Sequence, residues 1–176
     1  MLDCLGAKQN GATLAVTLVL LLIVSVLGIS AVQMSLVEEK MSGNLRDKHI
    51  AFEAAETALI RAEATLDEIL EYSTPTYDGS SGIWIYGGPG GINWWIANSD
   101  SWWVANSESV VPNSLQSSAP QYIVEERAVS QRGEDLKVGN GEIPQARYYY
   151  QITARGYGGS SDTRVHLRTT YIKRYD

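Results

Sequence analysis

A long uncharged run dominates the N-terminal part of the chain. From Ala12 to Val32 the sequence has 21 residues, mostly Leu, Val and Ile, without a single charge. About 20 apolar residues are enough for a helix to cross a bilayer, so the run predicts a transmembrane helix over residues 12–32. A secretory signal peptide is the rival interpretation, but its apolar region is shorter and ends in small residues, a pattern that residues 29–31 match poorly.

Apolar residues continue beyond the uncharged run, now at helical spacing. They recur every three or four positions at Ala51, Ala54, Ala55, Ala58, Leu59, Ala62, Leu66, Ile69 and Leu70. This period predicts an amphipathic helix over residues 33–72 that packs on other structure through one face. If the helix has an interruption, Gly43-Asn44 is the expected place, because glycine costs about 1 kcal/mol relative to alanine inside a helix. The sequence leaves open whether the helix breaks there.

Three segments of the C-terminal third are rich in Tyr, Ile, Val and Thr and alternate in part between apolar and polar residues. They predict antiparallel strands near residues 121–127, 147–156 and 163–173, within a sheet region over 121–176. A glycine- and serine-rich turn separates the last two segments. Helix and sheet together predict an α+β fold in which the apolar stripe of the helix covers one face of the sheet.

Residues 73–120, rich in Gly, Ser, Asn, Pro and Trp, predict a long loop region between helix and sheet. Two similar units follow each other within it, WWIANSDS at 94–101 and WWVANSES at 102–109. We predict that they form a hairpin or paired extended segments at the far end of the domain. Adjacent residues of a strand point to opposite faces, so each pair would pack one ring on the sheet and offer the other to a neighbouring subunit. The candidate interface residues are Trp94, Trp95, Trp102 and Trp103.

Two other interpretations of the repeat stay open. The rings could stack on a sugar or on another surface, as a ligand platform. A calcium site at 98–101 or 106–109 is disfavoured, because each unit holds one carboxylate and the spacing differs from the twelve-residue EF-hand pattern.

Charge and composition disfavour several classes of protein. The net charge of -6 argues against a nucleic-acid binder, which needs a basic face for the phosphates. The single cysteine, Cys4, cannot form an internal disulfide, and the only histidines, His49 and His166, are expected to be surface or packing residues. Glycines at 87–91 lack the Lys and Ser/Thr of a phosphate loop and predict a flexible turn. The sequence therefore predicts no enzyme, no metal site and no cofactor.

The residues directly before the apolar run carry a more specific pattern. The segment KQNG, ending at Gly11, is followed at once by ATLAV. This junction resembles a type IV prepilin leader, which prepilin peptidase removes on the cytoplasmic side after the glycine. The resemblance implies cleavage between Gly11 and Ala12, removal of a leader over residues 1–11 together with Cys4, and retention of the apolar run.

The segment SLVEEKMSGNLRDKHIAFEAAETALIRAE, residues 35–63, resembles the N-terminal signature of PilX-type minor pilins, in which E-K-M-x-G-N-x-R-D leads into A-F-x-A-A-E-x-A-L. The matching residues are Glu39, Lys40, Met41, Gly43, Asn44, Arg46, Asp47, Ala51, Phe52, Ala54, Ala55, Glu56, Ala58 and Leu59. The segment ITARGYGGSSDTRVHLRTTY is similar, less distinctively, to the end of these proteins. The resemblance implies a type IV pilin-like fold and a subunit that helps to start pilus assembly.

The same resemblance implies a place in the cell and a set of partners. The chain would sit in the bacterial inner membrane with its N-terminus cytoplasmic and its C-terminal domain periplasmic, and would then enter the pilus near its tip. The weak positive bias of Lys8 against Glu38 and Glu39 agrees with that orientation. The implied partners are other minor pilins, the pilus assembly machinery and prepilin peptidase.

One position departs from the general pilin pattern. Most pilins carry glutamate at the fifth mature position, where it pairs with the terminal amine of a neighbouring subunit, and here that position is Val16. A carboxylate at the centre of a membrane helix costs about 2.5 to 3.5 kcal/mol, so it needs such a partner, whereas valine does not. This absence also resembles the K-type pseudopilin of type II secretion. It favours either a tip position or simple tolerance in a rare subunit. A K-like pseudopilin and a membrane-anchored binding module that uses the tryptophan loop remain the alternative functions.

Overall fold

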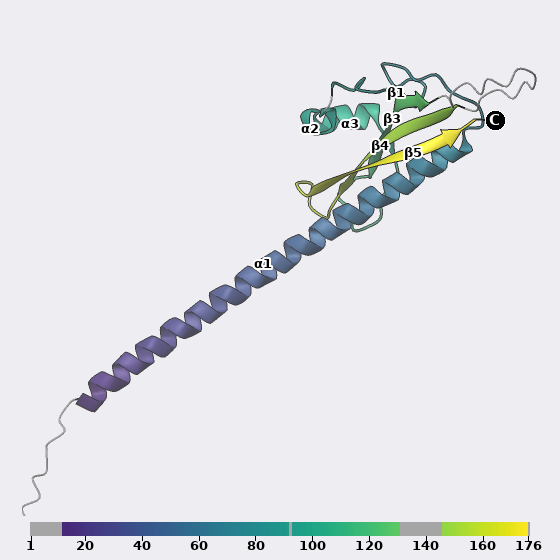
Figure 1. Cartoon of the computed structure of the whole chain (residues 1–176). Coiled ribbons are helices and arrows are strands. Elements are labelled where there is room, and N and C mark those ends of the chain that lie inside the picture. The colour runs from purple at the N-terminus through teal and green to yellow at the C-terminus, as the bar shows by residue number, and fades with distance from the viewer. Residues whose placement is uncertain (1–11, 92, 131–145, 176) are drawn as a thin grey trace, which may run out of the picture. The chain divides into compact units, whose positions relative to one another are not determined.

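The structure is a computed structural model that describes residues 12–91, 93–130 and 146–175 (Figure 1). Its elements are α1 (Ala12–Glu68), β1 (Trp84–Ile85), α2 (Trp94–Ala97), α3 (Asp100–Asn106), β2 (Glu108–Ser109), β3 (Gln121–Ser130), β4 (Arg147–Tyr157) and β5 (Arg164–Arg174). One long helix followed by a sheet confirms the predicted α+β architecture. The chain divides into an N-terminal unit, up to Leu45, and a C-terminal unit, from Arg46, and each is described by itself.

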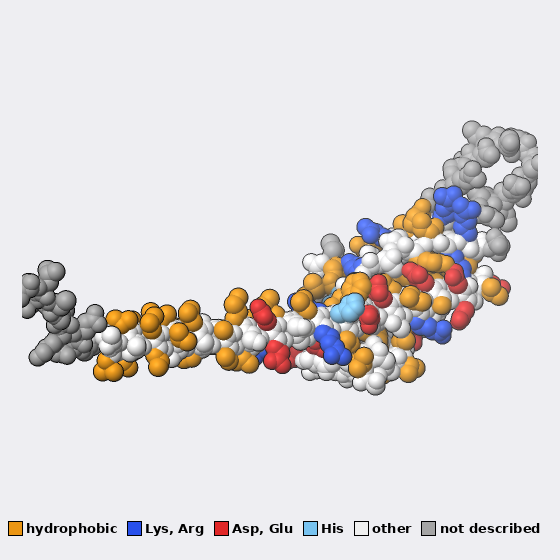
Figure 2. Space-filling view, turned by 90° about the horizontal axis from the view of Figure 1, so that it is seen from below, with side chains coloured by type: hydrophobic (Ala, Val, Ile, Leu, Met, Phe, Trp, Pro, Cys, Tyr) orange, Lys and Arg blue, Asp and Glu red, His pale blue; other side chains and the backbone are white. Residues whose placement is uncertain are grey.

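The described part of the N-terminal unit, residues 12–45, is helix with its apolar side chains uncovered. Figure 2 shows hydrophobic side chains around this part of α1, and Leu21 and Val24 are 67% and 66% exposed. The helix is long and apolar enough to cross a membrane, as the sequence predicts. The sequence leaves open whether the helix breaks at Gly43-Asn44, and the structure shows no break there, because α1 continues through both residues. A single glycine costs about 1 kcal/mol, which the helix-forming residues on either side offset.

In the C-terminal unit, α1 buries a face made of small side chains. The buried residues are Ala51, Ala54, Ala55, Ala58, Ala62 and Leu66, all on the predicted stripe. The stripe ends earlier than predicted, since the helix stops at Glu68 and Leu70 is 84% exposed. Alanine side chains allow the sheet to approach the helix backbone closely. At Gly156 of β4 an added Cβ would lie 2.2 Å from Ala51 O and 2.3 Å from Ala55 N.

The sheet is mixed, with an antiparallel centre. β3, β4 and β5 pair in that order as antiparallel neighbours, which confirms the three predicted strands. β1 pairs with β3 in parallel, with Trp84 opposite Glu125, and β2 pairs with β3 antiparallel. The parallel strand was not predicted, because a two-residue strand has no detectable hydrophobic period.

Both faces of the sheet are buried, by different parts of the chain. Neighbouring side chains alternate between the faces. The helix side holds a core of Ala58, Ala62, Leu66, Ile83, Tyr122, Val124, Tyr150, Ile152 and Ala154. A second core, called the tryptophan cluster below, consists of Trp84, Trp94, Trp103 and Ile123. Residues 73–120, predicted as a loop, therefore contribute four short elements, and Figure 1 shows α2 and α3 on the side of the sheet opposite α1.

The close approach at Gly156 gives a stability prediction. We expect Gly156→Ala to lower the free energy of unfolding by about 1 to 3 kcal/mol, because its Cβ would meet helix backbone that cannot rotate away. Thermal unfolding of the full chain in detergent micelles, followed by circular dichroism, measures the change. Gly43→Ala is the matched control: nothing lies within 4 Å of its Cβ position, so helicity should be equal or higher. Equal melting of Gly156→Ala and the wild type would contradict the close contact.

Candidate functional site

The family-signature residues divide between the two units. Glu39, Lys40, Met41, Gly43 and Asn44 are exposed in the N-terminal unit. In the C-terminal unit, Arg46 and Glu56 are exposed while Ala54 and Ala55 are buried. The alanines of the signature thus form the contact with the sheet, while Arg46 and Glu56 lie away from it. Of the processing positions, Gly11 lies outside the described residues and Ala12 is the first residue of α1.

Asp47 is the charged signature residue with a structural contact. Its Oδ1 accepts hydrogen bonds from the backbone N–H of Gly159 at 2.6 Å and of Ser160 at 3.3 Å, in the turn that joins β4 to β5. Gly158 lies so close that a Cβ there would be 2.6 Å from the same oxygen. The Thr163 side chain and these backbone N–H groups hold the pKa of Asp47 below its usual value. Asp47 therefore ties the strand turn to the helix.

A second tie lies near the other end of the buried part of α1. Tyr171 of β5 donates a hydrogen bond from its hydroxyl to the Asp67 carboxylate, which raises the pKa of Tyr171 to about 12. Lys173 donates from Nζ to the carbonyl oxygens of Leu66 and Asp67, the last residues before the helix ends. Carbonyls at a helix C-terminus lack partners within the helix, so a lysine there satisfies them. β5 is thereby fixed to α1 near both of its ends.

The tandem tryptophan units fold into short helices, so the predicted hairpin of extended segments is wrong. The polar residues that follow each Trp-Trp pair form the ends of α2 and α3. Ser99 precedes α3 and accepts a hydrogen bond from Trp102 N at 3.3 Å, while Asn106 Nδ2 donates to Trp102 O at 2.8 Å. A serine at that position is a strong helix start, and this favours a helix over a strand.

The helices nevertheless separate the rings of each pair. Trp94 and Trp103 are buried, with exposures of 1% and 0% and ring centroids 5.2 Å apart. Trp95 and Trp102 are only partly buried. The third residue of each unit, Ile96 in one and Val104 in the other, is 73% and 71% exposed. The exposed apolar surface of the repeat is thus aliphatic rather than aromatic.

A buried arginine joins α3 to the sheet. The Arg155 guanidinium is 1% exposed and lies between the rings of Trp103, at 5.3 Å, and Tyr157, at 4.8 Å. Its Nη2 donates to Asp100 Oδ1, which also accepts from Arg164 Nη1 at 2.6 Å. Hydrogen bonding to Arg155 holds the pKa of Asp100 below its usual value. A buried charge needs such a partner, because leaving it unpaired is strongly destabilising.

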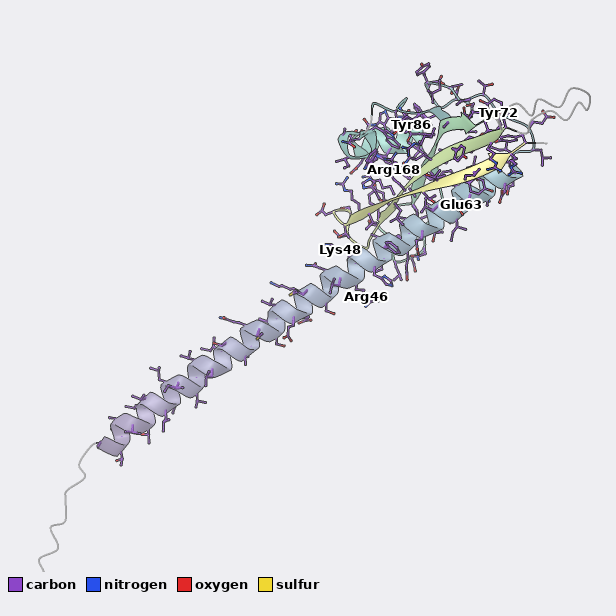
Figure 3. The ribbon with its side chains drawn as sticks, viewed as in Figure 1. Arg46, Lys48, Glu63, Tyr72, Tyr86 and Arg168 are labelled. Atoms are coloured by element: carbon purple, nitrogen blue, oxygen red, sulfur yellow. The ribbon has the colours of Figure 1, made fainter. Side chains whose placement is uncertain are left out.

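A second charged pair lies beneath α2. Glu125 of β3 is 1% exposed, accepts a hydrogen bond from Gly87 N at 3.0 Å, and lies 3.6 Å from Arg168 Nη2. Burial raises the pKa of Glu125. Arg168 in turn lies 3.8 Å over the Trp95 ring, and Figure 3 shows it on the side of the sheet away from Glu63 of α1. The glycine segment 87–91 is a turn, as predicted, and it supplies a donor to this carboxylate.

The two histidines and Asp100 make surface or packing contacts. His49 is exposed, with Nε2 3.2 Å from Glu53 Oε1, and His166 lies 5.7 Å from the Trp103 ring, so both predictions are confirmed. Burial lowers the pKa of His166 to about 4, which keeps it neutral at pH 7. Within residues 12–91, 93–130 and 146–175, no group of three or more His, Cys, Asp or Glu is placed to hold a metal ion. Asp100, the carboxylate of the weighed calcium interpretation, is held by two arginines.

The sequence could not identify Arg155 and Glu125 as buried charges. The strand period does place Arg155 on the face opposite Ala154, as neighbouring residues alternate. Its partner Asp100 is 55 residues away in the chain, inside a segment with no strand or long-helix period. Only the folded arrangement brings the two together.

The contacts of Asp47 give a pH-dependent prediction. Its folded pKa is lowered, so the stabilisation is present above the unfolded value, about 3.9, and is lost as the pH falls through the folded pKa. We expect Asp47→Asn to lower the free energy of unfolding at pH 7 by at most about 1 kcal/mol, since the carboxylate is largely solvated. Urea unfolding of the full chain in detergent should show this difference narrowing below about pH 4.

Glu56→Gln is the matched control, because it removes the same charge from an exposed position of the same helix. It should leave the unfolding curve unchanged at both pH values. Asp47→Asn unfolding together with the wild type at pH 7 would show that the tie does not contribute.

Comparison with known families identifies the chain. The model described as PilX N-terminal matches residues 10–59, and the model described as Type IV pilus assembly protein PilX C-term matches residues 63–173. No curated protein and no solved structure matches the chain. The two family matches cover both the signature helix and the sheet that packs on it. The chain belongs to the PilX family of type IV pilus assembly proteins.

Proposed function

We propose that this chain is a minor pilin that helps to start type IV pilus assembly in a tip complex with other minor pilins. The observation that carries the proposal is the uncovered apolar helix of the N-terminal unit. Its most apolar stretch is 0% buried. Such a helix requires a bilayer, or neighbouring apolar helices, to cover it. In a structural subunit that passes from the membrane into a fibre, the bilayer covers this helix first and neighbouring subunits cover it afterwards.

The proposed route begins in the inner membrane, with the N-terminus cytoplasmic and the C-terminal unit periplasmic. Prepilin peptidase would cleave between Gly11 and Ala12, so that α1 begins at the new terminus. Val16, 58% exposed on this helix, offers no carboxylate to the terminal amine of a neighbour. A subunit at the leading end has no subunit ahead of it to receive that contact, which supports the tip position.

The proposed contact with a neighbouring minor pilin is the surface of α2 and α3. Trp94 and Trp103 belong to the core and are unavailable, whereas Trp95 and Trp102 are half-buried. Ile96 and Val104 supply exposed apolar area at equivalent positions of the two repeat units. Interfaces commonly combine such an apolar centre with partly buried aromatic anchors.

Deletion of the gene tests the function. We expect the deletion strain to lose most surface pili and twitching motility, because assembly would lack a starting subunit. Reintroducing the chain with an epitope tag should restore both, and immunogold labelling of sheared pili should mark fibre ends. Mass spectrometry of the restored protein should find Ala12 as its methylated N-terminus.

Each of these three experiments has an outcome that would contradict the proposal. Normal piliation with blocked enzyme secretion would move the chain to a type II secretion pseudopilus. Label along the fibre shafts would remove the tip position, and retention of residues 1–11 in cells that process other prepilins would remove the assembly function.

The proposed interface is tested by charge insertion. We expect Val104→Glu to weaken co-purification with a partner minor pilin at least about tenfold, because desolvating a carboxylate opposes burial of the surface. Its melting temperature should not change, since Val104 is 71% exposed. Val111→Glu, at a residue 89% exposed outside α2 and α3, is the matched control and should bind normally. Equal binding by both variants would show that the partner contacts another surface.

A further inference from the structure

A cavity of about 260 Å³ lies between α2 and the ends of β4 and β5 that carry the arginines. Its lining residues are Trp95, Ile96, Asn98, Arg155, Arg164 and His166. Pockets for small molecules begin at about 300 Å³, so the space suits a single small ring. The assembly function proposed above uses Trp95 and Ile96 of this lining for a contact with a neighbouring pilin but gives its charged and polar residues no role.

The charges around the cavity are unbalanced toward positive. Arg155 and Arg164 both donate to one oxygen of Asp100, so two guanidinium charges share one carboxylate. His166 adds no charge at pH 7, because burial and the two arginines lower its pKa to about 4. Arg155 is 1% exposed and its Nε has no hydrogen-bond partner among the described residues. A second anion would therefore be attracted to the cavity by the surplus positive charge.

Arg164 is the group that can touch such an anion directly. Its side chain is 42% exposed, and its bond to Asp100 uses Nη1. A guanidinium has five N–H donors, so others remain for a ligand carboxylate. The buried Arg155 contributes positive potential to the cavity, while Arg164 makes the direct contact with the anion.

The other walls suit a ring that carries hydroxyl groups. Trp95 and Ile96 provide apolar surface, and Ile96 is 73% exposed. Asn98 donates one N–H of Nδ2 to Pro89 O at 3.0 Å, so its carbonyl oxygen and its second N–H remain for a hydroxyl. The Nε2 of His166 has no partner among the described residues. Sugar rings combine an apolar face with hydroxyls around the edge, which matches this mixture.

We propose that the cavity binds a carboxylated monosaccharide unit, with its carboxylate on Arg164, its ring against Trp95 and Ile96, and its hydroxyls near Asn98 and His166. An aspartate or glutamate side chain of a peptide would satisfy Arg164 but has no hydroxyls for the other polar groups. A neutral sugar would leave the surplus positive charge without a negatively charged partner. This binding function goes beyond the assembly role, and because it shares Trp95 and Ile96 with the proposed pilin contact, a ligand and a neighbouring subunit would compete for these two residues.

Saturation-transfer NMR and calorimetry on the full chain test the proposal. The protein is kept in lauryldimethylamine oxide micelles, because sugar-based detergents would compete. Methyl glucuronide should bind with a dissociation constant on the order of 1 mM or tighter. Methyl glucoside, which has a hydroxymethyl group in place of the carboxylate, should bind at least about tenfold more weakly, as should acetyl-glutamate methylamide.

Two variants locate the binding. Arg164→Gln should weaken methyl glucuronide at least about tenfold, and Arg174→Gln, the same charge change at the exposed far end of β5, should not. Ile96→Glu places a carboxylate beside the cavity from an exposed position, so it should weaken binding even if Arg164→Gln fails to fold. Circular dichroism confirms the fold of each variant.

Three results would overturn the proposal. Equal binding of the glucoside would remove the charge requirement. Equal or tighter binding of the glutamate derivative would assign the cavity to an acidic peptide. Absence of binding, or equal losses in Arg164→Gln and Arg174→Gln, would show that the cavity is not the site.

Discussion

The close packing of the alanine face of α1 on β4 is the contact on which the C-terminal unit depends. Ala51 and Ala55 present backbone atoms where a larger side chain would hold the strand away, and Gly156 contributes no side chain of its own. Small residues on both sides let the two backbones meet, and the dense packing makes the position intolerant of added volume. This close contact at Gly156 sets the spacing between the helix and the sheet.

That contact uses only one face of the sheet, so the other face needs a separate cover. A sheet with one bare apolar face would expose Ile123 and the residues beside it. The tryptophan cluster covers this face with a few very large side chains, each able to bury 150 to 250 Å². Two helices of four and seven residues are enough for this, because their stability comes from burial and, in the seven-residue α3, also from the bonds of Ser99 and Asn106 to Trp102.

The sequence predicted the parts of the fold that have a period and missed the parts that have none. Alanines at helical spacing placed the buried face of α1, and tyrosine-rich alternation placed β3, β4 and β5. Whether the helix breaks at Gly43 stayed open in the sequence, because the cost of one glycine has to be weighed against the helix-forming turns around it. The Trp-Trp pairs fit either a strand or a short helix, since both can send neighbouring side chains in different directions. The Ser99 cap favours a helix over a strand for the second pair. Ser99 was visible in the sequence, but its capping role was not considered.

Charge partners were beyond sequence reasoning because they join distant segments. Arg155 and Asp100, like Glu125 and Arg168, come from different elements, and each pair links the covering segment to the sheet or one strand to another. Each arginine also lies against a tryptophan ring, so the charges and rings constrain one another. A surface built on such contacts changes shape little when a subunit or ligand arrives, and this lowers the entropic cost of association. The buried charges thus hold in place a surface whose most exposed apolar side chains, Ile96 and Val104, are aliphatic.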